Sequence, residues 1–134
     1  MNPDAPLVSL AYNKSIEASC LYKHGGYYYL FVNWGSCCQG VKSTYNIRVG
    51  RSRKVTGPYL DKDGIDMLKG GGTLLLSKKG PLFGAGHAGI LVDNGKNWFT
   101  SDFEGDTRMG GKATLAIMPL AWKSGWPDVK VVDQ

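Results

Sequence analysis

The feature that most constrains the fold of this sequence is an internal repeat with a spacing of 69 residues. The turn at Gly25-Gly26 recurs at Asn94-Gly95. Apolar residues on either side match at the same spacing: Leu21 with Ile90, Tyr29 with Trp98, and Leu30 with Phe99. Each copy has the pattern of strand, tight turn and strand. The chain is therefore predicted to contain two copies of one β-meander.

Further strand-like segments extend each copy. Residues 45–51 alternate in polarity and predict a third strand, and residues 74–76 predict a short fourth one. In the second copy the predicted strands are residues 87–92, 97–100 and 113–117. Polar loops are expected over residues 34–43 and 104–112. The 19 glycines and six prolines among 134 residues favour many turns, and a hydrophobic content of 43% is sufficient for a core.

A meander of three or four strands is typical of a β-propeller blade. Two blades cannot close a ring, and each would leave one apolar face uncovered. The chain is therefore expected to belong to a larger propeller, or to associate with other chains to complete one. A two-sheet sandwich is the alternative that needs no further partner.

Charge and cysteine content exclude several classes of protein. The net charge is +5, and the densest basic cluster is Arg48, Arg51, Arg53 and Lys54. We interpret these cations as solvated strand residues rather than as a nucleic-acid site. No apolar stretch is long enough to span a membrane, and no signal-like start is visible. Cys20 and the adjacent pair Cys37-Cys38 match neither a disulfide framework nor a zinc-binding spacing.

The repeat places two polar residues just before the first strand of each copy. Glu17 aligns with Gly86, and His87 aligns with Ala18. The meander returns the predicted loops to this same end, so one cleft can be built from all four pieces. A carboxyl group in partly apolar surroundings suits a general acid, although a surface glutamate is the simpler interpretation. His87 is equally open to a role in packing or capping.

Several consecutive motifs resemble glycoside hydrolase family 43, and especially its endo-1,5-α-L-arabinanases. The segment Ser15-Ile-Glu-Ala18, followed by residues 21–32, is similar to the blade of this family that carries the general acid. The continuation also resembles the arabinanases, in residues 37–52, 70–76, 86–89, 115–122 and 125–127. Together the motifs cover nearly all of residues 15–129.

The resemblance implies an all-β, five-bladed β-propeller to which this chain contributes about two blades. After an extended lead-in at residues 1–14, the blades are expected at about 15–80 and 81–134. The implied enzyme hydrolyses α-1,5-linked L-arabinofuranose chains (arabinan) with inversion. Glu17 matches the general acid, and His87 matches the residue that contacts calcium or another hydrated cation near the propeller axis. Trp34, Cys38 and Arg108 are candidates for sugar contact from their expected loop positions.

The family also uses two aspartates, which belong to blades that precede the acid blade. Asp4 does not match the motif of either one. The chain alone is therefore expected to be inactive and to need the N-terminal blades on another chain, or an intermolecular assembly that replaces them. A proteolytic piece, a truncated gene and a split enzyme all fit this sequence. A carbohydrate-binding propeller fragment without catalysis is the alternative function. The complete enzyme is expected to be extracellular or periplasmic.

Overall fold

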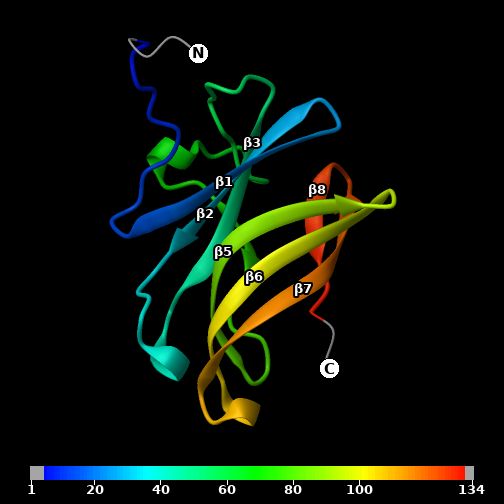
Figure 1. The fold of residues 1–134 in the computed structure, drawn as a ribbon. Helices are drawn as coiled ribbons and strands as arrows, with labels where there is room; N and C mark the ends of the chain where they lie inside the picture. Colours follow the sequence, from blue (N-terminus) through cyan, green and yellow to red (C-terminus); the bar gives the residue numbers. More distant parts are fainter. Residues whose placement is uncertain (1–4, 132–134) are drawn as a thin grey trace.

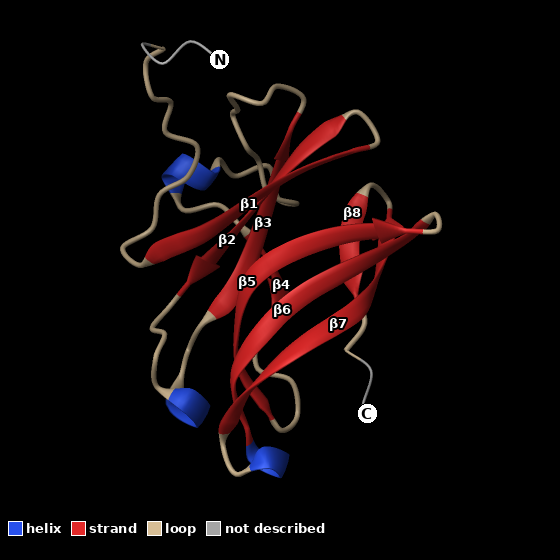
Figure 2. Cartoon of the chain, in the orientation of Figure 1, coloured by secondary structure: helices blue, strands red, loops and turns tan. Residues whose placement is uncertain are grey.

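The computed structural model describes residues 5–131, and these form two four-stranded antiparallel sheets (Figures 1 and 2). The first sheet has the order β1 (Ile16–His24), β2 (Tyr27–Trp34), β3 (Asn46–Ser52) and β4 (Thr73–Leu76). The second has the order β5 (Leu82–Asp93), β6 (Lys96–Asp106), β7 (Lys112–Lys123) and β8 (Trp126–Val129). Three single-turn 3-10 helices lie in the loops: η1 (Gly40–Lys42), η2 (Met67–Lys69) and η3 (Thr107–Met109). The predicted all-β class is confirmed.

Corresponding hairpins begin the two sheets. Leu21 pairs with Leu30 across the first hairpin, and Ile90 pairs with Phe99 across the second. The turn residue Gly26 has φ +79°, in the left-handed region that glycine adopts without steric cost, and Gly95 at φ +73° does the same in the second hairpin. The repeated sequence pattern therefore corresponds to a repeated strand–turn–strand unit.

The second sheet is more extensive than its sequence pattern indicates. β6 continues to Asp106, so the predicted loop at residues 104–112 shrinks to η3 and its flanks. Residues 126–129, which resemble a turn in the sequence, form the edge strand β8. Pro127 is tolerated there because one side of an edge strand needs no hydrogen-bond partner.

The main core lies between the two sheets. Its buried side chains include Phe31 and Ile47 from the first sheet and Phe99 and Phe103 from the second. The rings of Phe31 and Phe99 lie 5.9 Å apart between centroids, within the range of favourable aromatic pairs. The first strands of the two sheets, β1 and β5, contact each other. Inner strands of adjacent blades meet in this way around a propeller axis.

The outer faces of the two sheets differ. On the first sheet, this chain's own residues 10–11 and the side chains of Tyr59 and Met67 pack over Leu30 and Val32. Part of the face expected to need another chain is thus covered internally. On the second sheet, Leu115 is 86% exposed and Ile117 is 61% exposed. This outer face of β7 is apolar and open among the described residues.

The loop at residues 61–72 is organised by its own backbone. The buried carboxylate of Asp61 accepts hydrogen bonds from the backbone N–H groups of Asp63, Ile65 and Gly72, at 2.9–3.0 Å. Burial raises the pKa of Asp61, but these donors outweigh burial and the net pKa is lowered.

No helix within residues 5–131 is long and apolar enough to cross a membrane.

Candidate functional site

Each sheet contains a β-bulge near the start of its first strand. The register shifts after Glu17 in β1 and after Gly86 in β5. Within these bulges Ala18 has φ +50° and His87 has φ +52°, in the left-handed region that residues with a side chain rarely adopt. Such conformations cost free energy and are concentrated at functional sites. The bulges therefore indicate a functional site at this end of the sheets.

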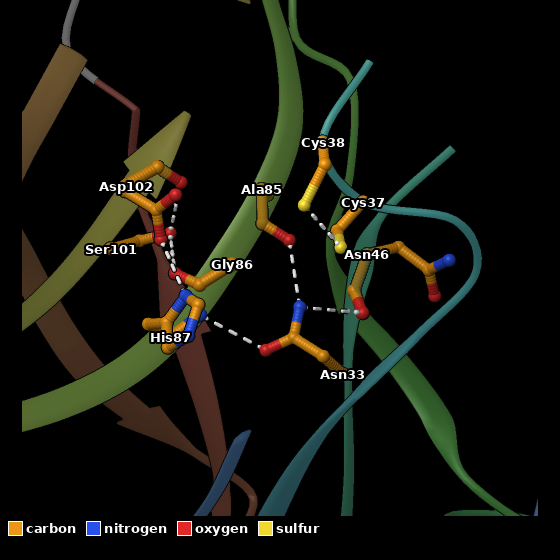
Figure 3. Close-up of polar contacts among 9 residues, drawn as sticks. All are labelled: Asn33, Cys37, Cys38, Asn46, Ala85, Gly86, His87, Ser101 and Asp102. Atoms are coloured by element: carbon orange, nitrogen blue, oxygen red, sulfur yellow. Dashed lines mark hydrogen bonds and ion pairs between the residues drawn. The ribbon is translucent and has the colours of Figure 1, made fainter. Parts of the chain in front are cut away.

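Asn33, near the end of β2, connects the two sheets at the bulge of β5 (Figure 3). Its side chain is fully buried. The amide Nδ2 donates to the carbonyl oxygens of Ala85 at 3.0 Å and Asn46 at 3.3 Å, and Oδ1 accepts from the backbone N–H of His87 at 3.0 Å. Asn33 is also the cross-strand partner of Glu17. One buried amide thus fixes the relative positions of the segments that carry Glu17 and His87.

The imidazole of His87 is oriented by Asp102 on β6 (Figure 3). Nδ1 lies 3.1 Å from Oδ1 of Asp102, and the histidine side chain is 68% exposed. The neighbouring Ser101 donates from its hydroxyl to the carbonyl oxygen of Gly86 at 2.7 Å. A carboxylate at one ring nitrogen favours the tautomer that leaves the other nitrogen available to bind a ligand. The ring of Tyr45 packs edge-on nearby, at 6.1 Å.

These groups line a pocket of about 430 Å³ at the ends of the two sheets. It brings together Glu17, His87 and Cys38, three of the five residues predicted from the sequence. The remaining lining residues are Cys37, Gly40, Tyr45, Asp102, Glu104 and Ala113. The loop carrying η1 closes one side, because the backbone N–H of Gln39 donates to Oε2 of Glu104 at 3.2 Å.

Tyr45 forms the buried floor of this pocket. Its hydroxyl is buried and makes no hydrogen bond of standard geometry with the described residues. The pKa of Tyr45 is raised, first by burial and then by the neighbouring carboxylate of Glu17. Tyr45 is therefore a neutral phenol at physiological pH, adjacent to the proposed acid.

The two adjacent cysteines form part of the pocket wall. The sulfur atoms of Cys37 and Cys38 lie 2.8 Å apart, and Cys38 has φ +63°. The hydrogen bond to Cys38, then burial, then the nearby charges raise the pKa of Cys37 to about 11. Cys37 is therefore a protonated thiol at neutral pH, and this argues against a nucleophilic role.

The other two predicted residues lie outside this pocket. Trp34 is the last residue of β2, and the guanidinium of Arg48 lies 4.8 Å from its ring centroid. Arg108, in η3, binds the buried carboxylate of Asp106 through Nε at 3.1 Å and Nη2 at 2.9 Å. Trp34 thus packs against its neighbours, and Arg108 stabilises the turn after β6.

Asn33, Tyr45, Asp102 and Glu104 are site residues that the sequence analysis did not identify. Asn33 and Asp102 are related by the same 69-residue spacing as the two hairpins. Asn33 follows an apolar run, and the shared spacing links Asp102 to it; this signal was available in the sequence. Tyr45 and Glu104 carry no comparable signal, because both resemble ordinary residues of a strand end.

The described residues offer few ligands to a metal ion at this pocket. Within residues 5–131, no group of three or more His, Cys, Asp or Glu side chains is arranged to hold a metal ion. His87 and Asp102 together offer one nitrogen and one carboxylate. Calcium prefers six to eight oxygen ligands, so water would have to supply most of its shell.

Two adjacent four-stranded blades with a polar pocket at their inner ends define part of a β-propeller. The family profile described as "Glycosyl hydrolases family 43" matches residues 4–127. The chain therefore belongs to glycosyl hydrolase family 43. This result confirms the predicted resemblance and favours the propeller over the sandwich.

Two curated relatives share 43% identity with the chain. One is the extracellular endo-alpha-(1->5)-L-arabinanase 1 of Bacillus subtilis, aligned over 95% of this chain and 39% of its own length. The other is the extracellular exo-alpha-(1->5)-L-arabinofuranosidase ArbA of Cellvibrio japonicus, aligned over 90% of this chain and 35% of its own length. The chain thus spans well under half the length of these relatives.

Solved structures show the same architecture. The endo-arabinanase from Bacillus licheniformis superposes with a TM-score of 0.86 at 41% identity, over 96% of this chain and 44% of that one. The Cellvibrio cellulosa alpha-L-arabinanase complexed with arabinohexaose superposes with a TM-score of 0.81 at 42% identity, over 87% of this chain and 37% of that one. The two sheets are therefore part of a propeller of the arabinanase type.

Proposed function

We propose that this chain forms part of a glycoside hydrolase that cleaves α-1,5-linked L-arabinofuranose chains with inversion. The observation that carries the proposal is the exposed carboxyl group of Glu17, which shares one pocket with His87 in a member of family 43. The names of the relatives support arabinan as the substrate class. The word "extracellular" in those names supports secretion. We propose blade bounds of about residues 15–80 and 81–134, of which residues 132–134 lie outside the described residues.

Glu17 is proposed to protonate the leaving glycosidic oxygen. In an inverting hydrolase a second carboxylate activates water on the opposite face of the sugar. Two other carboxylates line this pocket, but Asp102 contacts the imidazole of His87, and Glu104 accepts the N–H of Gln39. Each of these carboxylates has one protein partner, and the resemblance to family 43 puts the base on blades that precede the acid blade, so the base is proposed to come from the remaining blades. We call the chain together with those blades the complete particle.

The stereochemistry of the first product tests this function. We expect the complete particle to release arabinose or oligosaccharides from linear 1,5-arabinan initially as the β-anomer, because water attacks opposite to the departing α-linked oxygen. Proton NMR of the anomeric signals during the first minutes is the measurement. Initial release of the α-anomer would indicate retention, and a complete particle that leaves arabinan intact would exclude the proposed substrate.

Among the sugar-contact candidates, Cys38 is the one supported by position, because it lines the pocket with Glu17. Trp34 and Arg108 can contact substrate only where a bound chain extends beyond this pocket.

The particle is proposed to be completed by N-terminal blades on another chain or by an equivalent assembly. The open apolar surface at Leu115 and Ile117 supports such an assembly, since exposed patches of this kind mark association sites.

We further propose that His87 contacts calcium, or a similar hydrated cation, at the propeller axis. Asp102 orients the imidazole, and the ring is exposed enough to receive a hydrated ion. We expect His87→Ala to release this ion from the complete particle, as measured by metal analysis after gel filtration in calcium-free buffer. Retention of stoichiometric calcium by the variant would contradict this role. Lys96→Ala, on the exposed start of β6, is the control and should retain the ion.

A second candidate function is binding without catalysis. The observation that favours it is that the other two carboxylates of the pocket, Asp102 and Glu104, each already contact a protein group. By itself the chain would then hold arabino-oligosaccharide at the pocket but not cleave it.

A further inference from the structure

A second hollow lies at the opposite end of the first sheet. β2 runs from Tyr27 at this hollow to Trp34 beside the start of β1, a distance of roughly 20 Å along the strand. The hollow has a volume of about 470 Å³, and its lining includes Tyr27 at the start of β2, Arg51 and Ser52 at the end of β3, and Trp126 at the start of β8. It is therefore separate from the pocket that contains Glu17.

Cationic and aromatic side chains alternate along this hollow. The guanidinium of Arg51 lies 4.4 Å from the ring centroid of Tyr27 and 4.5 Å from that of Trp126. The guanidinium of Arg53 also lies 4.4 Å from the ring of Tyr27, and Nζ of Lys62 lies 5.8 Å from that of Trp126. We call Arg51, Arg53, Lys54 and Lys62, with these two rings, the basic–aromatic cluster.

The positive charge of the basic–aromatic cluster is poorly neutralised. None of its four cations forms an ion pair within residues 5–131. Asp61 lines the hollow, but its carboxylate accepts three backbone N–H groups, as described above. Asp128 pairs with Lys123 and lies within the electrostatic reach of Lys62. Four cations thus face two carboxylates that are both already engaged.

Arg51 is also held in place before any ligand arrives. Nη1 of Arg51 donates to the carbonyl oxygen of Gly125 at 2.7 Å, and this bond links the two sheets. Stacking on an aromatic ring fixes the plane of a guanidinium and leaves its edge N–H groups free to bind a carboxylate in a bidentate manner. A hollow of this volume is in the range of small-ligand sites and exceeds the needs of a single inorganic ion.

We propose that the basic–aromatic cluster binds the carboxylates of an acidic oligosaccharide, at a site distinct from the cleavage pocket. Fixed, unpaired guanidinium groups favour carboxylates over neutral sugars. The choice of a carbohydrate rests on the proposed function, because the relatives of this chain act on polysaccharides. Such a site would hold the protein on a charged polymer while the other end of the propeller acts on a neutral chain.

The test is the binding of trigalacturonate to the full chain at low salt, measured by titration calorimetry. We expect the double variant Arg53→Gln/Lys54→Gln to weaken binding about tenfold or more, because it removes two charge-assisted contacts from exposed residues. Lys78→Gln is the matched control, since Lys78 also lies over an aromatic ring, 4.3 Å from the centroid of Phe83, away from the hollow. It should change the affinity less than about twofold.

Several outcomes would overturn the proposal. These are no binding of trigalacturonate, an equal loss in Lys78→Gln, equal affinity for neutral arabinotriose, or equal affinity for inorganic phosphate, which would indicate a simple ion site. Hydrolysis of arabinan by complete particles with the same substitutions separates this proposal from the cleavage function. Cleavage of arabinan without binding of trigalacturonate (the uronate probe) rejects only the site at the basic–aromatic cluster. Uronate binding without arabinan cleavage rejects the proposed function alone.

Discussion

The Glu17→Gln variant of the complete particle is expected to lose roughly 10²–10⁴-fold of its turnover on linear 1,5-arabinan, the usual contribution of general acid catalysis. The amide keeps the shape of the carboxyl group but cannot donate the proton that the leaving alkoxide needs. Glu17 is exposed in this chain and the amide can still accept from the neighbouring Tyr45 hydroxyl, so the substitution should change the unfolding midpoint little. The rate of reducing-sugar release from arabinan is the measurement.

Substrates with different leaving groups test whether Glu17 acts as a general acid. An aryl arabinofuranoside with a very acidic phenol needs no protonation, so Glu17→Gln should cleave it at a rate close to that of the parent. Glu104→Gln is the matched control, because Glu104 lines the same pocket but its carboxylate is engaged by the N–H of Gln39. A Glu17→Gln particle that hydrolyses arabinan at the parent rate would end the general-acid assignment. An equal loss on both substrates would point to a general defect in binding or folding.

The repeat was the most informative feature of the sequence, and the structure shows that it relates more than the hairpins it predicted. The residues aligned at a spacing of 69, Ala18 and His87, both occupy left-handed positions within β-bulges. The same spacing relates Asn33 to Asp102, which hold the backbone and the imidazole of His87 respectively. The two copies of the repeat share their backbone geometry, while their side chains differ in chemistry.

Strand patterns identify the end of the sheet at which a residue lies, but they do not give the direction of its side chain. Trp34 lies at the expected end, yet its ring packs against Arg48 rather than facing the pocket. Arg108 follows a strand that is longer than predicted, and the buried carboxylate of Asp106 binds its guanidinium.

Tertiary contacts also determined features that local patterns could not. β8 contains a proline and resembles a turn in the sequence, but pairing with β7 and the burial of Trp126 make it a strand. The packing of Tyr59 and Met67 over the first sheet depends on a loop that returns from a distance in sequence. Such long-range contacts leave no periodic signal in the residues that make them.

The chain alone is expected to produce no detectable sugar from linear 1,5-arabinan, whereas the complete particle should cleave it. General acid catalysis cannot replace the base and the positioning that the other carboxylates of an inverting hydrolase provide. The pocket of this chain contains three carboxyl groups, and two of them are held by His87 and by the N–H of Gln39. Parallel assays of the chain and the complete particle, at equal concentrations of Glu17, are the measurement.

The Asp102→Asn and Glu104→Gln variants of the chain test whether one of its own carboxylates can act as the base. If the chain alone cleaves arabinan, one of these two carboxylates must activate water, and its substitution should abolish that activity. Such a result would mean that the pocket is catalytically self-sufficient and would reject the need for further blades. If neither the chain nor either variant cleaves arabinan while the complete particle does, the base lies outside this chain. The exposed apolar surface at Leu115 and Ile117 would then be the first place to seek contact with the missing blades.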